Sequence, residues 1–191
     1  MDCQIYLVRH GIPELPYEGH RFLGTTDYPL SGEGKAALAE TRGFFAGKKI
    51  SRVYTSPLIR AIETAREVFG AERNIEIVPE LIEIEMGAWE GLAIEELQEQ
   101  CPGEYEARCL DMEGYVPPGG ESFGALLARA MPALVEIARG KGPAAVFGHS
   151  CVIRCVIGAL TGVPMNDLFS IDVPYGSVTQ IGLEDGLLRV M

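Results

Sequence analysis

The stretch QIYLVRHG, residues 4–11, sets the expected fold of this chain. Residues 4–8 are rich in Ile, Tyr, Leu and Val, which is typical of a short buried strand. The polar triplet Arg9, His10 and Gly11 follows at the point where that strand should end. We therefore expect the triplet at the carboxyl end of a strand, the edge at which open α/β sheets bind their ligands.

The remainder of the chain alternates between short apolar runs and helical patterns. Further strands are predicted at 52–55, 75–78 and 144–147, with a C-terminal hairpin from Ser177 that turns at Glu184, Asp185 and Gly186. Helices are predicted from Ser31 or Glu33 to Phe45, and over 56–69, 94–100, 122–139 and 151–160. This alternation predicts an α/β three-layer sandwich with a largely parallel central sheet and helices on both faces.

The length of 191 residues fits a single domain with one hydrophobic core. No internal repeat, low-complexity tract or linker divides the chain. Residues 88–120 are the least regular part and end in the turn-forming sequence PPGG. We expect this segment to form a small cap over the active site.

The net charge of −11 argues against nucleic acid or an anionic membrane as the main partner, because both are bound by clustered Lys and Arg. Twelve of the basic residues are nevertheless Arg and only four are Lys. The planar fork of Arg matches a phosphate or carboxylate group. An anionic small molecule can therefore still bind if several of these Arg converge. The oligomeric state stays open, with a homodimer as one alternative.

Five Cys occur at spacings that fit neither a disulfide framework nor a paired zinc motif. No apolar run approaches the ~20 residues of a membrane span, and the first residues do not have the pattern of a signal peptide. These features predict a cytoplasmic protein with reduced thiols. The three His are scattered over different segments, so we expect neither a metal ion nor another cofactor.

Two of the three His, His10 and His149, directly follow predicted buried strands, and Arg60 lies one turn into a predicted helix. A phosphoryl group needs cations for its oxygens, an in-line nucleophile and a proton for the departing oxygen. Arg9 and Arg60 can supply the cations, and a neutral imidazole can be the nucleophile. Gly11 lets a substrate approach the backbone closely. The segment LIEIEMG, residues 81–87, supplies candidate carboxyl groups.

Each of these residues also has a structural interpretation. His10 can be an ordinary hydrogen-bonded histidine at a strand end. Arg9 and Arg60 can be surface ion-pairing residues, and Glu83 can be one member of a solvated acidic run. The pair Ser56-Pro57 is explained as a helix start, with Ser56 capping free N–H groups and the proline at the first helical position.

Taken together, the segments LVRHG (7–11), YTSPLIRAIETA (54–65) and VFGHS (146–150) resemble motifs of the histidine phosphatase superfamily, also called the phosphoglycerate-mutase-like family. The resemblance implies that His10 becomes phosphorylated. It also implies that Arg9, Arg60 and His149 bind the phosphoryl group. Glu83 lies four residues before the Gly87 of GAWEG and has the position of the family's acid–base glutamate, whereas Glu85 does not. The segment PGGES, residues 118–122, matches a further motif of mainly structural role.

The resemblance extends to the substrate loop and to the branch of the family. The segments RFLG (21–24) and DYPLS (27–31) match a loop that touches substrate. The expected substrate-binding residues are Gly11, Arg21, Leu23, Gly24 and Ser150. Ile12 and Pro13 depart from the Glu-Thr that often follows Gly11 in the family. The stretch between Gly91 and Pro117 is short beside the insertion of the mutases, so the chain is more similar to the phosphatase members, including α-ribazole phosphatases.

Three other functions share features with this sequence. Phosphoglycerate mutase activity uses the same histidine chemistry, and a non-catalytic phosphate-binding module would use the same arginines. The sequence GHSCV, residues 148–152, is similar to the nucleophile elbow of α/β-hydrolases, but Val152 replaces the last glycine and no His follows His149. The preferred hypothesis is a metal-independent phosphomonoester hydrolase, with α-ribazole 5′-phosphate as one candidate substrate.

Overall fold

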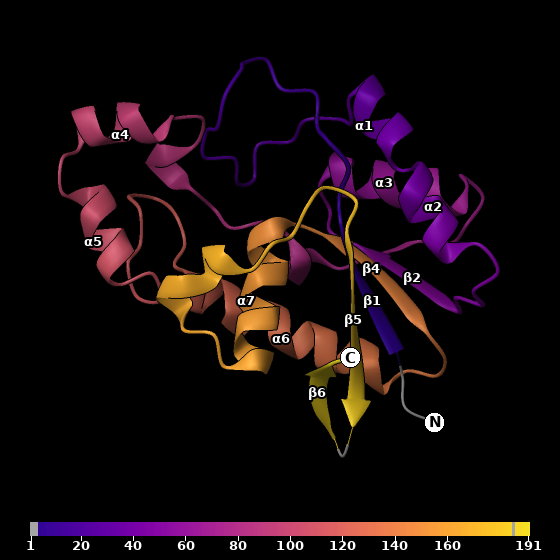
Figure 1. The fold of residues 1–191 in the computed structure, drawn as a ribbon. Coiled ribbons are helices and arrows are strands. Elements are labelled where there is room, and N and C mark those ends of the chain that lie inside the picture. The colour runs from indigo at the N-terminus through magenta and orange to yellow at the C-terminus, as the bar shows by residue number, and fades with distance from the viewer. Residues whose placement is uncertain (1–3, 185) are drawn as a thin grey trace.

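The centre of the protein is a six-stranded sheet with the strand order β3-β2-β4-β1-β5-β6 (Figure 1). The computed structural model describes residues 4–184 and 186–191. The strands are β1 (Gln4–Arg9), β2 (Arg52–Thr55), β3 (Glu76–Ile77), β4 (Ala144–Gly148), β5 (Val178–Glu184) and β6 (Leu187–Val190). Strands β3, β2, β4 and β1 pair in parallel, β5 runs antiparallel to β1, and β6 runs antiparallel to β5. The largely parallel sheet is therefore confirmed.

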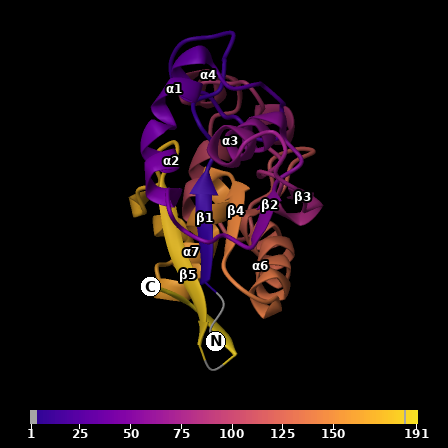
Figure 2. The same cartoon turned by 90° about the vertical axis from the view of Figure 1, so that its right-hand side faces the viewer.

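Helices cover both faces of this sheet (Figures 1 and 2). They are α1 (Gly32–Ala37), α2 (Ala39–Phe45), α3 (Ile59–Phe69), α4 (Ile94–Gln100), α5 (Glu104–Leu110), α6 (Phe123–Arg139) and α7 (Ser150–Thr161). Short 3₁₀ turns span Pro79–Leu81, Gly87–Trp89 and Met165–Ser170. Within the described ranges, no helix combines the length and the apolar character needed to cross a bilayer.

The two faces of β1 belong to two separate apolar clusters. Ile5 and Leu7 pack with residues of α6 and α7. Tyr6 and Val8, which point to the opposite face, pack with residues of α2 and α3. Since successive side chains of a strand alternate between faces, a run of apolar residues such as that of β1 requires cover on both sides. The predicted three-layer arrangement is confirmed.

Several predicted element boundaries were wrong. The single helix expected up to Phe45 is two helices, α1 and α2, which meet at Leu38. The helix expected at Ser56 begins at Ile59. The strand expected over 75–78 is reduced to β3, whose two residues are exposed at the sheet edge. The turn of the predicted C-terminal hairpin includes Asp185, which lies outside the described residues, as does Cys3.

The segment 88–120 is more regular than expected, because it contains α5 in addition to the predicted α4. Figure 2 shows that β1 points toward the end of the molecule where α4 lies. The segment thus lies at the carboxyl-end side of the parallel strands, which is the side where ligands of open α/β sheets bind.

Candidate active site

A cavity of about 340 Å³ lies where the predicted catalytic residues meet. Seven of the predicted site residues line it, namely Arg9, His10, Arg21, Leu23, Arg60, Glu83 and Ser150. His149 lies directly behind this group, with its ring centroid 5.1 Å from that of His10. The ends of β1 and β4, helix α3, the loop between the 3₁₀ turns Pro79–Leu81 and Gly87–Trp89, and the start of α7 therefore converge on one place.

His10 is held in the form that a nucleophile requires. Its backbone N–H donates to the Gly148 carbonyl at 3.0 Å, which ties the end of β1 to the end of β4. Its ring Nδ1 lies 2.7 Å from the Gly11 carbonyl oxygen, which can only accept, so Nδ1 donates and Nε2 keeps the lone pair. Burial, together with the charges of Arg60 and Arg9, holds the pKa of His10 well below its ordinary value. The imidazole is therefore neutral at physiological pH.

Two arginines lie beside this imidazole, of which Arg60 is buried and Arg9 half-buried. Arg60 donates to the carbonyl oxygens of Thr26 at 2.7 Å and Gly24 at 2.6 Å. Arg9 donates to the Val173 carbonyl at 2.6 Å, and its guanidinium lies 3.7 Å from the centre of the Tyr175 ring. Within the described part of the chain, neither forms an ion pair, and the Nε atom of each has no hydrogen-bond partner. Desolvation lowers the pKa of both groups. This uncompensated positive charge is suited to an anion.

Glu83 is the buried carboxyl group of the site, with 3% of its surface exposed. Its Oε1 accepts from the Ile84 N–H at 3.0 Å and its Oε2 from the Cys151 N–H at 3.1 Å, in the first turn of α7. These bonds and the nearby arginines favour the charged form, but burial outweighs them and raises the pKa of Glu83. A carboxyl group that keeps its proton more readily than usual can act as a general acid. Glu85 is exposed.

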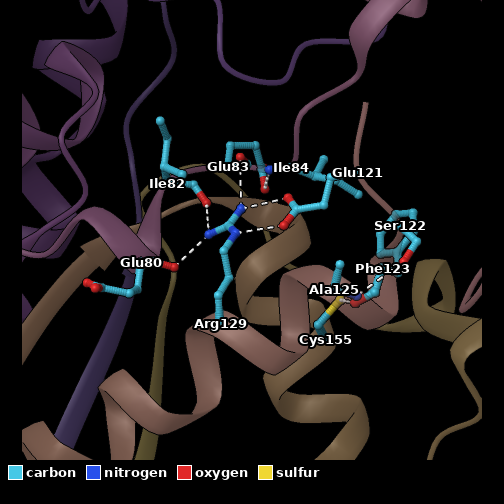
Figure 3. Close-up of polar contacts among 10 residues, drawn as sticks. All are labelled: Glu80, Ile82, Glu83, Ile84, Glu121, Ser122, Phe123, Ala125, Arg129 and Cys155. Atoms are coloured by element: carbon cyan, nitrogen blue, oxygen red, sulfur yellow. Dashed lines mark hydrogen bonds and ion pairs between the residues drawn. The ribbon is translucent and has the colours of Figure 1, made fainter. Parts of the chain in front are cut away.

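The backbone that carries Glu83 is fixed by Arg129 of α6 (Figure 3). The Arg129 guanidinium donates to the carbonyl oxygens of Glu80 at 2.6 Å, Ile82 at 2.8 Å and Glu83 at 3.1 Å. It also forms a two-point ion pair with the Glu121 carboxylate at 2.8 and 2.9 Å. Glu121 belongs to the PGGES segment, so this segment acts through Arg129 to hold the position of Glu83.

His149 is completely buried and is oriented by Ser56. The His149 Nε2 and Ser56 Oγ atoms lie 2.6 Å apart, and the His149 Nδ1 has no partner among the described residues. The predicted helix start at Ser56-Pro57 was wrong, because α3 begins at Ile59, and Ser56 has a second contact beyond the expected cap. The helix starts three residues after Ser56, whose side chain does accept from the Leu58 N–H at 3.3 Å but also contacts the second imidazole. Burial and the charges of neighbouring groups hold the pKa of His149 well below its ordinary value.

A comparison with known protein families gives a match that spans most of the chain. The family model described as "Histidine phosphatase superfamily (branch 1)" matches residues 5–191. This chain belongs to the histidine phosphatase superfamily. The Alpha-ribazole Phosphatase from Shigella flexneri has a similar structure, with a TM-score of 0.84 and 25% identity over 98% of this chain and 94% of that one.

Curated relatives of this chain carry several different names. The 6-phosphofructo-2-kinase/fructose-2,6-bisphosphatase of Caenorhabditis elegans is 31% identical over 93% of this chain but only 38% of its own length. The chain thus spans less than half of that relative. Phosphoserine phosphatase 1 of Hydrogenobacter thermophilus is 28% identical over 95% of this chain and 87% of its own length. The relatives support phosphatase chemistry and differ in substrate.

Two of the predicted substrate-binding residues, Gly11 and Gly24, do not line this cavity. The Gly11 N–H donates to Thr64 Oγ1 at 2.9 Å. The Gly24 carbonyl accepts from Arg60, and a Cβ atom at Gly24 would collide with the Ile84 carbonyl. Both glycines therefore position the chain around the site, and neither presents its surface to the cavity.

Arg21, Leu23 and Ser150 line the cavity as predicted, but Arg21 already has a partner. Its guanidinium forms an ion pair with Glu96 of α4, with a shortest distance of 2.6 Å, and donates to the Gly91 carbonyl at 2.9 Å. Arg21 thereby links its own loop to the cap segment. Its role in binding substrate remains a prediction, as it does for Leu23 and Ser150.

Several cavity residues were missed by sequence reasoning. The cap segment contributes Ile94, Tyr105 and Arg108, and the chain beyond α7 contributes Phe169 and Tyr175. None of them lies in a segment with a recognisable motif or at the end of a strand. Their only signal is the arrangement of the folded chain, which brings α5 and the loop before β5 to the same cavity.

Arg60→Lys is expected to lower turnover and to weaken inhibition by vanadate, each by about 10- to 100-fold, the effect of losing a hydrogen bond to a charged group. Lys keeps the positive charge but lacks the planar guanidinium. It therefore cannot donate to both carbonyl oxygens and to an oxyanion at the same time. The measurement is the vanadate inhibition constant together with kcat. Arg66→Lys, at an exposed position of the same helix, is the matched control. Unchanged vanadate affinity in Arg60→Lys would place Arg60 outside the site.

The profile of kcat/KM against pH is expected to be bell-shaped. The lowered pKa of His10 keeps its imidazole neutral at pH values where an ordinary histidine would be protonated. The raised pKa of Glu83 keeps its carboxyl group protonated at pH values where an ordinary glutamate would be charged. Activity should fall at low pH as His10 gains a proton and at higher pH as Glu83 loses one. His149→Asn should shift one limb, since neighbouring groups titrate together. An unchanged profile in that variant would show that His149 does not titrate in catalysis.

Proposed function

We propose that this chain is a phosphomonoester hydrolase that acts on a small phosphorylated metabolite through a phosphohistidine at His10. The observation that carries the proposal is the neutral His10 ring, with its Nε2 lone pair free, beside two arginines that form no ion pair within the described residues. We place the enzyme in the cytoplasm and expect it to need no metal ion, because the arginines supply the positive charge. No nucleic acid or membrane partner is proposed.

The proposed reaction has two halves. In the first half, His10 Nε2 attacks the phosphorus in line with the ester oxygen, the P–N bond forms and the P–O bond breaks. Glu83 gives its proton to the departing alcohol. Arg9, Arg60 and His149 hold the equatorial oxygens, whose charge must be matched by fixed donors as the bond breaks. In the second half, the Glu83 carboxylate takes a proton from water, which attacks phosphorus, and the P–N bond breaks to release phosphate.

The substrate is proposed only as a class. The similarity to the Shigella flexneri enzyme supports α-ribazole 5′-phosphate as one candidate, while the curated relatives support a fructose bisphosphate or phosphoserine. A mutase would use the same intermediate and return the phosphoryl group to a second alcohol in place of water. A phosphate-binding module would use Arg9 and Arg60 but would not need a buried acid such as Glu83.

A screen of phosphomonoesters in the presence of excess EDTA tests the proposal. We expect release of inorganic phosphate from at least one small ester, with a rate that EDTA does not change. Isomerised ester without release of phosphate would favour the mutase. Binding of phosphate without turnover of any ester would favour the module, and loss of activity with EDTA would contradict metal independence.

A further inference from the structure

The segment 88–120 places a fourth arginine, Arg108, in the cavity that Arg9, Arg21 and Arg60 also line. Arg108 lies in α5, is 6% exposed and lines the cavity together with Arg9, His10 and Glu83. Its guanidinium is surrounded by aromatic rings. The ring centres lie 5.1 Å (Phe123), 5.6 Å (Phe22), 5.8 Å (Trp89) and 5.8 Å (Phe169) from its central carbon.

The charge of Arg108 is not balanced by an acidic side chain. In the ranges that the structure describes, Arg108 forms no ion pair, and its Nη2 is buried without a hydrogen-bond partner. The groups that face it are the thiols of Cys151 and Cys109 and the phenols of Tyr105 and Tyr115. Burial raises the pKa of the Cys151 thiol to about 12, so this thiol is neutral. Arg108 is therefore a permanent cation with no anionic partner among the described residues.

Two further arginines near the site, outside the pair Arg9 and Arg60, do have carboxylate partners. Arg21 is paired with Glu96 and Arg129 with Glu121. Only part of the cost of burying Arg108 can be offset by the surrounding rings through cation–π contacts. A buried, unpaired guanidinium that borders a cavity is arranged as a binding group for an anion that enters the cavity.

We propose that Arg108 binds a second anionic group of the substrate, a carboxylate or a further phosphate carried by the alcohol part of the ester. This inference rests on the proposed function, and it narrows the substrate class to esters with two anionic groups. Arg9 and Arg60 bind the phosphoryl group that is transferred, and they lie on the side of the sheet. Arg108 binds the second anion, and it lies on the side of the segment 88–120. A cavity of about 340 Å³ is of the size that holds small metabolites.

Two matched pairs of esters test the proposal and separate the two anions. 3-Phosphoglycerate and glycerol 3-phosphate differ by a carboxylate, and 1,3-propanediol bisphosphate and 3-hydroxypropyl phosphate differ by a phosphate. We expect the wild-type enzyme to prefer the anion-bearing member of one pair. Arg108→Met should lower kcat/KM for that member by about 10- to 100-fold and leave kcat/KM for the member without the second anion nearly unchanged. The pair that shows the effect identifies the anion.

Three controls keep the result interpretable. Arg139→Met removes the same charge from an exposed position of α6 and should not alter the preference. Arg108→Lys keeps the charge but loses the fork, so it should fall between the wild type and Arg108→Met. Thermal unfolding of each variant reports whether the aromatic cluster still folds. The ratio of kcat/KM values for the two members of a pair is also measured in the wild-type enzyme, so this part of the test depends on no variant.

Two outcomes would overturn the inference while leaving the proposed function in place. In the first, the wild-type enzyme hydrolyses both members of each pair equally well. In the second, Arg108→Met lowers kcat/KM by the same factor for the member with the second anion and for the member without it. That is the result expected of a purely structural arginine. Failure of the wild-type enzyme to hydrolyse any phosphomonoester would instead overturn the proposed function, and the inference with it.

Discussion

His10→Ala is expected to abolish turnover, with a loss on the order of 10⁴-fold or more, as for removal of a nucleophile in other enzymes. The reason is that, among the described residues that line the cavity, His10 is the imidazole that combines a free Nε2 lone pair with the nearby charges of Arg9 and Arg60. Rapid quenching with a phosphorus-labelled ester should trap a labelled protein in the wild type and none in the variant. The quench must avoid acid, because a P–N bond is acid-labile.

His20 provides the matched control for this experiment. It also borders the cavity, but it is exposed, so His20→Ala should still form the labelled protein. Normal turnover by His10→Ala would contradict the phosphohistidine mechanism. Label that persists in His10→Ala and disappears in His149→Ala would move the nucleophile to the other buried imidazole.

The sheet and the catalytic group were predictable from the sequence because their signals are local. A buried strand followed by polar residues is visible within about ten residues, and the parallel arrangement then brings all such ends to one edge. These local signals are sufficient to place His10, Arg60 and His149 at that edge. Glu83 was found by its distance from Gly87 in a resemblance to a family, and its burial could not be read from its acidic neighbours.

The remaining features depend on contacts between distant parts of the chain. Ser56 contacts His149 across 93 positions, and Arg129 holds the Glu83 carbonyl across 46. No local pattern distinguishes such a serine from a helix cap or such an arginine from a surface residue. The position of Arg108 in the cavity could not be predicted for the same reason. Its lack of a carboxylate partner among the described residues is a property of the folded segment 88–120 and not of the sequence of α5.

Glu83→Gln is expected to reduce kcat by ~10²–10⁴-fold with an alkyl phosphate, the usual contribution of general acid catalysis. Gln fits the space of Glu, but its single carbonyl oxygen can accept from only one of the Ile84 and Cys151 N–H groups, and its NH2 group then faces the other. Thermal unfolding of the variant is therefore measured beside its activity. Gln cannot give a proton to the departing oxygen or take one from water. The loss should be smaller with a nitrophenyl phosphate, since a good leaving group departs without a proton and only the water step is impaired.

Glu85→Gln is the matched control for this prediction, because Glu85 lies two residues away but is exposed. It should retain its activity with both kinds of ester. The pH profile supplies an independent measurement. If the raised pKa of Glu83 sets the alkaline limb, that limb should disappear in Glu83→Gln and persist in Glu85→Gln. A loss of only a few-fold in Glu83→Gln with the alkyl ester, together with an unchanged alkaline limb, would transfer the acid–base role to another carboxyl group.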